Sequence, residues 1–189
     1  CDGLAARLLG AYSEVGKELD SLSDLVSFGV LPAIMLYCTT GSCGWICYIP
    51  LIIAVFSALR LAKFNLDERQ HSGFLGLPTP ACAMICGSLA CFAFSSPESV
   101  LASLCHSCWF VPALSIVLSL LLVSEIPMFS MKFGKDTVQD RRTGILRIIF
   151  LAAAVLTVCI VAAFRLHWSL TILIIFSIYI VMNIISPKQ

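Results

Sequence analysis

Residues 16–33 read GKELDSLSDLVSFGVLPA, a stretch that begins polar and becomes apolar. The apolar run continues to Tyr37, so the pattern predicts one helix over about 13–37. Asp20 and Asp24 are four residues apart and therefore share one face of that helix. A carboxylate at the centre of a membrane helix costs about 2.5–3.5 kcal/mol on insertion scales. Two such groups in one helix need a compensating partner, so Asp20 and Asp24 are candidate functional residues.

The composition of the whole chain is that of a membrane protein. The 189 residues are 59% hydrophobic and 12% charged, with a mean hydropathy of +0.98. An ordinary soluble domain is about half apolar and about one quarter charged. This composition argues against a soluble globular domain, because a bilayer can cover apolar surface that a chain of this size could not bury. The net charge of +1 gives no indication of a nucleic-acid partner.

Long apolar segments recur along the chain and are separated by short polar loops. A helix that spans a bilayer needs about 20 predominantly apolar residues. The segments predict a single all-α domain over 1–189, a polytopic transmembrane bundle of about six full membrane helices that follow a truncated N-terminal helix. Their expected ranges are 1–11 (the truncated helix), 13–37, 45–65, 79–95, 108–131, 144–164 and 167–186.

Basic residues alternate between the two sets of loops. The loops 38–44 and 95–107 contain no Lys or Arg, and the last loop contains only Arg165. The opposite set carries Arg69, Lys132, Lys135, Arg141, Arg142, Arg147 and, at the tail, Lys188. Lys and Arg concentrate in cytoplasmic loops of membrane proteins. We therefore expect the turn that precedes residue 13 to face the cytoplasm.

A third carboxylate, Asp2, precedes Asp20 and Asp24 across a short turn. Like charges that lie close together resist ionising together, and a divalent cation removes that difficulty. A ligand set made of oxygen atoms suits a hard ion such as Mg²⁺ or Mn²⁺ and does not suit zinc. Gly3 and Gly16 are interpreted as positions where the backbone lets a bulky ligand approach. The presence of three acids in this arrangement favours a cation-binding role over a plain position at the cytoplasmic interface.

The spacing of these residues resembles the signature of the CDP-alcohol phosphatidyltransferase family, which is Asp-Gly-x2-Ala-Arg-x8-Gly-x3-Asp-x3-Asp. The matching positions in this chain are Asp2, Gly3, Ala6, Arg7, Gly16, Asp20 and Asp24. The resemblance implies a membrane helix bundle with a polar cavity that faces the cytoplasm. It also implies a reaction in which an alcohol displaces CMP from a CDP-linked donor.

The same resemblance implies the role of each residue in the motif region 2–24. Asp2, Asp20 and Asp24 would bind two Mg²⁺ or Mn²⁺ ions, and Asp24 would also be the general base. The CDP group would be bound by Gly3, Ala6, Arg7 and Gly16. The family pattern has a further Asp three residues before the position of Asp2, so we expect residues upstream of Cys1. A homodimer in a bacterial cytoplasmic membrane is also implied.

The residues that follow Asp20 bear on the identity of the alcohol. Relatives that use glycerol phosphate tend to have Asp-Pro-x-x-Asp, whereas this chain has Asp-Ser-Leu-x-Asp followed by SFGV at 27–30. Together with ALRLAKFN at 58–65 and GLPTP at 76–80, this pattern resembles the phosphatidylserine synthase branch of the family. The resemblance implies transfer of a phosphatidyl group from CDP-diacylglycerol to L-serine.

Three residues near the end of the segment 45–65 are candidates for binding the acceptor or a phosphate. Arg60 and Lys63 could receive the serine carboxylate or a donor phosphate, and Asn65 could orient the acceptor. Lys63 replaces the Arg that is more usual at this position of the family, which keeps the charge and loses the planar fork of donors. The alternative for both cations is anchoring at the cytoplasmic interface, with the charged ends reaching water.

Two other functions remain open on the sequence alone. Another acceptor, such as inositol phosphate or glycerol phosphate, would call for a further basic cluster that faces the cavity. A cation transporter would be expected to show repeats and helices broken at mid-membrane. Here the acids cluster near one interface and no internal repeat is evident.

The ten cysteines lie mostly within apolar runs, where they behave as small hydrophobic residues. A disulfide among Cys38, Cys43, Cys105 and Cys108 is an open hypothesis, because spacing cannot decide pairing. A zinc site near His106 is disfavoured, since no second His-rich cluster completes four ligands.

Overall fold

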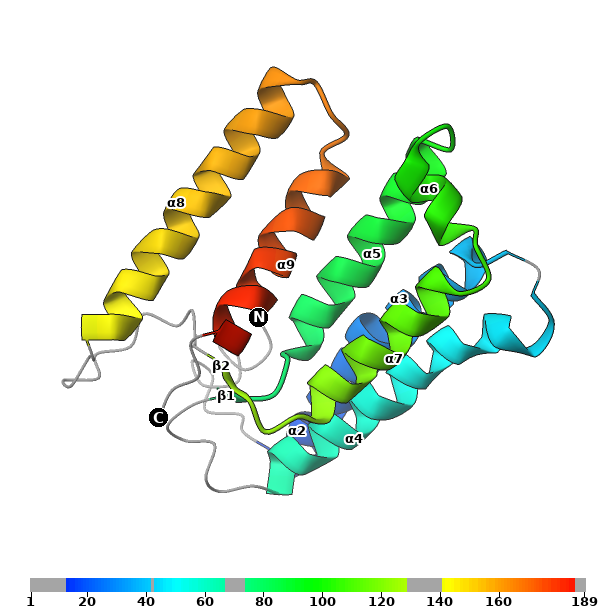
Figure 1. The fold of residues 1–189 in the computed structure, drawn as a ribbon. Coiled ribbons are helices and arrows are strands. Elements are labelled where there is room, and N and C mark those ends of the chain that lie inside the picture. Colours follow the sequence, from blue (N-terminus) through cyan, green and yellow to red (C-terminus); the bar gives the residue numbers. More distant parts are fainter. Residues whose placement is uncertain (1–12, 42, 67–73, 129–140, 186–189) are drawn as a thin grey trace.

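The computed structural model describes residues 13–41, 43–66, 74–128 and 141–185, which form a helical bundle (Figure 1). The first four helical elements are α2 (Glu14–Leu25), the π-helical turn η1 (Val26–Val30), α3 (Leu31–Thr39) and the 3₁₀ segment η2 (Gly44–Leu51). They are followed by α4 (Ile52–Leu66), α5 (Thr79–Ser95), α6 (Val100–Cys105), α7 (Phe110–Val123), α8 (Arg141–Ala163) and α9 (Ser169–Ile185). Two short strands, β1 (Phe74–Leu75) and β2 (Pro127–Met128), complete the described elements.

The helix predicted over 13–37 is confirmed as the continuous run of α2, η1 and α3. Ser13 caps its start, where the hydroxyl accepts a hydrogen bond from the Gly16 N–H at 3.1 Å. The wider π turn η1 precedes Pro32, which cannot donate a backbone hydrogen bond and whose ring would crowd the carbonyl of Phe28 in a regular α-helix. We attribute the π turn to this proline.

The helix α5 lies at the centre of the bundle and packs against α3 on one side and α9 on the other (Figure 1). The helix α4 packs with α7, and α8 packs on the far side of α9. Fully buried side chains fill the space between these helices, including Leu36, Ile53, Leu77, Leu89 and Leu122.

Large apolar side chains also cover the outer faces of the described helices, including Val55, Leu120, Ile148 and Val155. A soluble monomer rarely exposes apolar surface this widely. Two helices are long and apolar enough to span a bilayer, Glu18–Thr39 and Gly44–Asn65, each of 22 residues. The shorter apolar helices are Thr79–Ser95, Phe110–Val123, Ile148–Ala163 and Ser169–Ile184. These features fit an α-helical membrane protein. The count of six spans stays a prediction, and the segment 1–11 lies outside the described residues.

The segment expected over 108–131 ends earlier than predicted, because α7 stops at Val123. The chain then turns into β2, which pairs antiparallel with β1 through Phe74↔Met128 and Leu75↔Pro127. We call residues 74–77 together with 121–128 the clasp.

Gly76 is required at the turn of the clasp. Its φ is +74°, and a Cβ placed there would lie 2.7 Å from the carbonyl oxygens of both Leu122 and Ser124. The N–H of Leu77 donates to Leu121 O at 2.9 Å. The clasp therefore joins the end of α7 to the start of α5.

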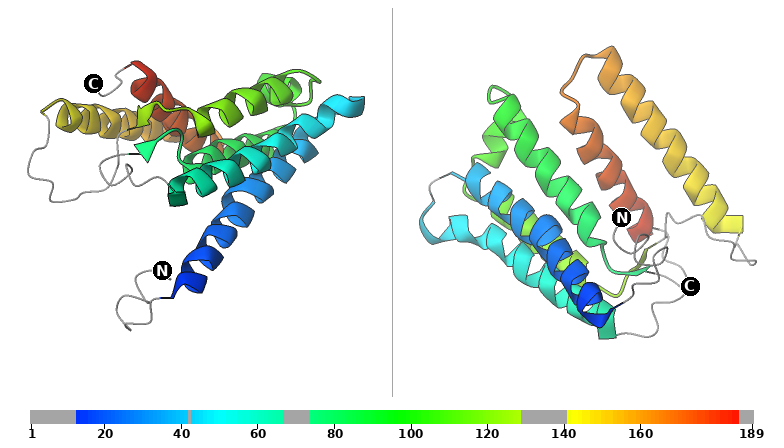
Figure 2. Two further views of the ribbon diagram at one scale, coloured as in Figure 1. Left: turned by 90° about the horizontal axis from the view of Figure 1, so that it is seen from below. Right: turned by 180° about the vertical axis from the view of Figure 1, so that it is seen from behind.

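Different loops and helix ends lie at the two ends of the bundle. At one end lie the loops around 40, 96–109 and 164–168, and the second of these contains the short helix α6, which the sequence did not predict. We call this end the α6 end. At the opposite end, the clasp end, lie the start of α2, the end of α4 and the start of α8 (Figure 1). Figure 2 shows that α2 projects away from the layer formed by the other helices.

Candidate active site

Asp20 and Asp24 lie on one helical element, α2, at the clasp end. Asp20 is exposed and Asp24 is half-buried. Four-residue spacing within a regular helix places the two carboxylates on the same face, as predicted. Gly16 lies one turn before Asp20, near the capping hydroxyl of Ser13. The remaining predicted residues of the motif, Asp2, Gly3, Ala6 and Arg7, lie outside the described residues.

The end of α4 contacts the middle of α2. The side-chain amide of Asn65 donates a hydrogen bond to the hydroxyl of Ser21 at 3.1 Å. Since Ser21 follows Asp20 directly, this bond places Asn65 beside the carboxylate-bearing turns. The two helices approach closely further along, where a Cβ added to Gly29 would lie 2.9 Å from Cβ of Ser57. Gly29 therefore permits the packing that aligns α4 with the motif helix.

Arg60 is buried, with only 8% of its surface exposed. One terminal nitrogen of its guanidinium donates to the hydroxyl of Thr79, the first residue of α5, at 3.4 Å. Its Nε has no hydrogen-bond partner among the described residues. A buried cation with an unpaired donor is costly unless an anion or water completes its contacts. This burial argues against interfacial anchoring as the role of Arg60.

Lys63 lies three residues after Arg60 and has a different environment. Its ammonium nitrogen is 4.0 Å from Oε1 of Glu125, and both side chains are exposed. An exposed pair of this kind contributes about 0–1 kcal/mol to stability. The three predicted acceptor residues thus have separate partners: Asn65 contacts α2, Arg60 contacts α5 and Lys63 contacts the segment after α7.

The carboxylates of Asp20 and Asp24 fit a hard divalent cation, because they offer oxygen ligands at helical spacing. Within the described ranges, no group of three or more His, Cys, Asp or Glu residues forms a metal site. The third predicted ligand, Asp2, lies outside those ranges. The residues present are therefore compatible with the expected Mg²⁺ or Mn²⁺ but supply only part of its ligand set.

Two contacts of this region were not predicted from the sequence. Thr79 was noted only as part of GLPTP, and its bond to Arg60 joins residues 19 positions apart. Ser21 was noted as part of a pattern and not as a partner of Asn65, from which it is separated by 44 positions. No local pattern reports such pairings, because they depend on how α2, α4 and α5 pack.

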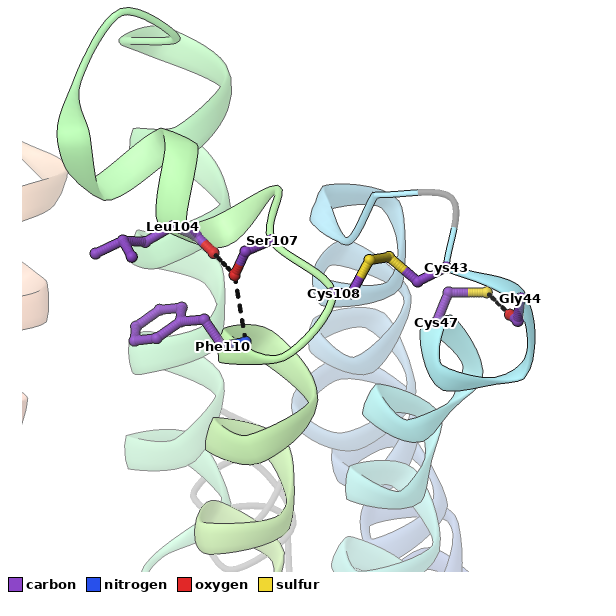
Figure 3. The surroundings of a disulfide bond; sticks show 7 residues. All are labelled: Cys43, Gly44, Cys47, Leu104, Ser107, Cys108 and Phe110. Atoms are coloured by element: carbon purple, nitrogen blue, oxygen red, sulfur yellow. Dashed lines mark hydrogen bonds between the residues drawn. A yellow bond between two sulfur atoms is a disulfide. The ribbon is translucent and has the colours of Figure 1, made fainter.

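At the α6 end, Cys43 and Cys108 form a disulfide across a sequence separation of 65 residues (Figure 3). This pairing is one of those left open by the sequence. Cys38, Cys47 and Cys105 are free thiols. A zinc site that used Cys43 or Cys108 as a thiolate ligand is inconsistent with this bond.

Comparison with known proteins adds to this geometry. The sequence profile of the CDP-alcohol phosphatidyltransferase family matches residues 1–121, more than half of the chain. Enzymes of this family generally depend on a divalent metal ion.

Three relatives share the name CDP-diacylglycerol–serine O-phosphatidyltransferase. The protein of Mycobacterium leprae is 41% identical over 69% of this chain and 45% of its own length. The protein of Mycobacterium bovis is 34% identical over 90% of this chain and 60% of its own length. The protein of Methanocaldococcus jannaschii is 33% identical over 94% of this chain and 74% of its own length. The chain thus spans about half the length of the mycobacterial relatives.

The family match covers the motif region that the sequence singled out, and the relative from Methanocaldococcus jannaschii aligns along almost the whole chain. The helical architecture and the paired carboxylates on α2 agree with both comparisons. The chain belongs to the CDP-alcohol phosphatidyltransferase family.

Proposed function

We propose that this chain is the catalytic domain of a phosphatidylserine synthase. It would transfer the phosphatidyl group of CDP-diacylglycerol to the hydroxyl of L-serine, releasing CMP and forming phosphatidylserine. The main support is the identity to relatives that carry the name of this activity. The bond from Asn65 to Ser21 adds structural support, because it puts a candidate acceptor residue beside the turns that carry Asp20 and Asp24.

The donor would bind over the motif helix. Asp2, Asp20 and Asp24 would hold two Mg²⁺ or Mn²⁺ ions, whose positive charge would neutralise the diphosphate as CMP leaves. The CDP group would lie against Gly3, Ala6, Arg7 and Gly16. Gly16 supports this assignment, because it carries no side chain and lies one turn before Asp20.

The proton of the serine hydroxyl would pass to Asp24. The hydroxyl oxygen would then attack the phosphorus of the phosphatidyl group, and the bond from that phosphorus to the oxygen of CMP would break. A carboxylate can act as general base when it lies within hydrogen-bond reach of the hydroxyl. Asp24 is more enclosed than Asp20, the other described acid of the motif, which supports this assignment over Asp20.

The acceptor would bind between α2, α4 and α5. Arg60 presents a buried guanidinium with an unpaired Nε, which suits a carboxylate such as that of serine. Asn65 would orient the acceptor next to Asp20 and Asp24. Lys63 is exposed and would contact a phosphate at the membrane surface, in exchange for its weak pairing with Glu125.

The choice of serine over a phosphorylated alcohol rests on the names of the relatives. Arg60 offers one buried guanidinium to the acceptor. An acceptor such as glycerol phosphate or inositol phosphate brings a dianionic group and would call for further buried cations. Such an acceptor remains the alternative within the family.

The cellular setting follows from the charge pattern and the family. The chain would span a bacterial cytoplasmic membrane six times as a single domain over 1–189, surrounded by membrane lipids. The clasp end, with the motif helix, would face the cytoplasm. A homodimer is part of the proposal on the resemblance to the family.

The activity can be tested with the full-length protein, CDP-diacylglycerol, Mg²⁺ or Mn²⁺, and separate samples of serine, glycerol 3-phosphate and inositol phosphate. We expect CMP release that depends on serine, with phosphatidylserine as the lipid product. CMP release that responds only to a phosphorylated alcohol would refute the serine assignment and keep the family chemistry.

A further inference from the structure

The disulfide between Cys43 and Cys108 joins two segments that are already in direct contact (Figure 3). Cys43 precedes η2, and Cys108 lies between α6 and α7. Beside the bond, a Cβ added to Gly41 would lie 2.6 Å from the carbonyl oxygen of His106. The two loops are therefore packed backbone against backbone, and the disulfide closes a contact that the fold has formed.

The choice of partner has a chemical reason. Cys105 is close in sequence to Cys108, but its side chain is buried, and burial raises the pKa of its thiol to about 11. Thiol–disulfide exchange proceeds through the thiolate. The raised pKa lowers the thiolate fraction of Cys105 and so disfavours its reaction, in agreement with its state as a free thiol in the structure.

All three tryptophans of the chain lie at this same end. Trp45 follows Cys43 by two residues, Trp109 is adjacent to Cys108, and Trp168 precedes α9. Their exposed fractions are 89%, 73% and 61%, so they are not core residues. Tryptophan is enriched where a bilayer meets water, because its ring is apolar and its N–H can bond to headgroups. Three exposed tryptophans in the segments at one end of the bundle indicate a lipid headgroup region.

The charge pattern and the redox chemistry give the same orientation. Among the described residues, the start of α2 (Lys17), the end of α4 (Lys63) and the start of α8 (Arg141 and Arg142) bring basic residues to the clasp end, which marks the cytoplasmic side. Disulfides persist in oxidising compartments outside the cytosol and are rare within it. The α6 end carries the disulfide and, in its loops, only Arg165 as a Lys or Arg residue. Two independent rules therefore assign the α6 end to the outer side of the membrane.

We propose that the α6 end is the extracytoplasmic membrane interface of the protein, anchored by three tryptophans among phospholipid headgroups and closed by an oxidatively formed disulfide. The bond forms after both loops have crossed the membrane. The thiols of Cys43 and Cys108 lose two protons and two electrons, and the disulfide of an extracytoplasmic thiol oxidase is reduced to a dithiol. This inference does not depend on which alcohol the enzyme uses.

Sidedness of the disulfide can be measured with the full-length protein in intact bacterial cells. Free thiols are first blocked with a membrane-permeant maleimide. The cells are then treated with a membrane-impermeant reductant and a membrane-impermeant maleimide carrying a polymer tag. We expect two tags per chain before lysis, and none of these in Cys43→Ser or Cys108→Ser. Cys47→Ser removes a free thiol from η2, which begins directly after Cys43; it is the matched control and should still gain two tags.

Tags that appear only after the cells are permeabilised would overturn the orientation, and a chain that never gains them would overturn the disulfide. The wild-type result alone decides the question if a serine variant does not fold. The headgroup contact has a separate test in liposomes that contain spin-labelled phospholipids. The fluorescence of these tryptophans is the difference between the wild type and a variant in which Trp45, Trp109 and Trp168 are changed to Phe. Spin labels near the headgroup should quench this difference signal more than labels at the middle of the acyl chain. Stronger quenching at mid-chain would refute the interface.

Discussion

Replacing Thr79 by Val should weaken serine binding without changing the affinity for CDP-diacylglycerol. Thr79 contacts Arg60 through its hydroxyl at 3.4 Å, and Arg60 is buried with a second donor already unpaired. Valine has nearly the same shape as threonine, so it removes the hydrogen bond and leaves the packing of α5. The guanidinium would then lose the contact that fixes its orientation toward the acceptor.

The magnitude follows from the geometry of the bond. A hydrogen bond to a charged group contributes about 1.5–3 kcal/mol, and 3.4 Å is longer than the preferred 2.7–3.2 Å range. We therefore take a lower value of about 1–1.4 kcal/mol, which corresponds to a roughly fivefold to tenfold change in an equilibrium constant. The expected result is a rise of about that size in the KM for serine.

The assay is serine-dependent CMP release at saturating CDP-diacylglycerol, together with a titration of the donor. Thr79→Ser keeps the hydroxyl and should restore most of the serine affinity. Ser88→Ala is the matched control, because it removes another buried hydroxyl of α5, which donates to Ile85 O of the same helix at 3.0 Å. A serine KM in the valine variant within about twofold of wild type would refute the role of the Arg60–Thr79 contact.

Four further outcomes are expected. Asp24→Asn should abolish CMP release but largely spare CDP-diacylglycerol binding, and full activity would exclude Asp24 as the base. Chelation of divalent metal should stop turnover, and added Mg²⁺ or Mn²⁺ should restore it; an unchanged rate would contradict metal assistance. Gly76→Ala should lower the thermal midpoint in detergent. A positive φ costs an L-residue about 1–2 kcal/mol, and the added Cβ would also clash with two carbonyl oxygens. Gly87→Ala is the control and should not lower the midpoint, because a Cβ there meets open space. Cys43→Ser should lower the thermal midpoint, with a loss of stability below the roughly 4 kcal/mol of a chain-entropy estimate, because the bilayer already restrains both loops; an unchanged midpoint would contradict a stabilising role of the bond.

The helices were predictable where hydropathy alone determines them. The range 79–95 agrees with α5 as observed, Thr79–Ser95, because a mainly apolar run lies between a Pro-rich start and a Ser-Ser-Pro stop. The range 108–131 was too long, because the apolar residues around Pro127 continue the hydropathy of α7 while their backbone pairs with β1. That pairing joins segments about 50 residues apart, and no local pattern reports it.

In the candidate site too, local spacing predicted some features, and others depended on how the helices pack. Spacing was enough to place Asp20 and Asp24 on one helix face, because helical periodicity is local. Arg60 and Lys63 were grouped by their spacing of three, but the structure gives them different partners in α5 and beyond α7. Which of two neighbouring cations becomes buried depends on the helices that pack around them, and this information is not in the spacing.

The π turn η1 marks a boundary along the motif helix. After it, α3 packs into the bundle, with Leu36 fully buried. Before it, α2 projects from the bundle (Figure 2) and is joined to α4 by the bond from Asn65 to Ser21. Under the proposed function, a membrane-embedded donor and an alcohol would both reach the carboxylates of Asp20 and Asp24. Because the α3 half is fixed in the bundle and the α2 half projects from it, the carboxylates on α2 can be reached by both the donor and the alcohol. The disulfide lies at the opposite end of the bundle, so it can hold α3, η2 and α7 together without restraining the half of the helix on which Asp20 and Asp24 lie.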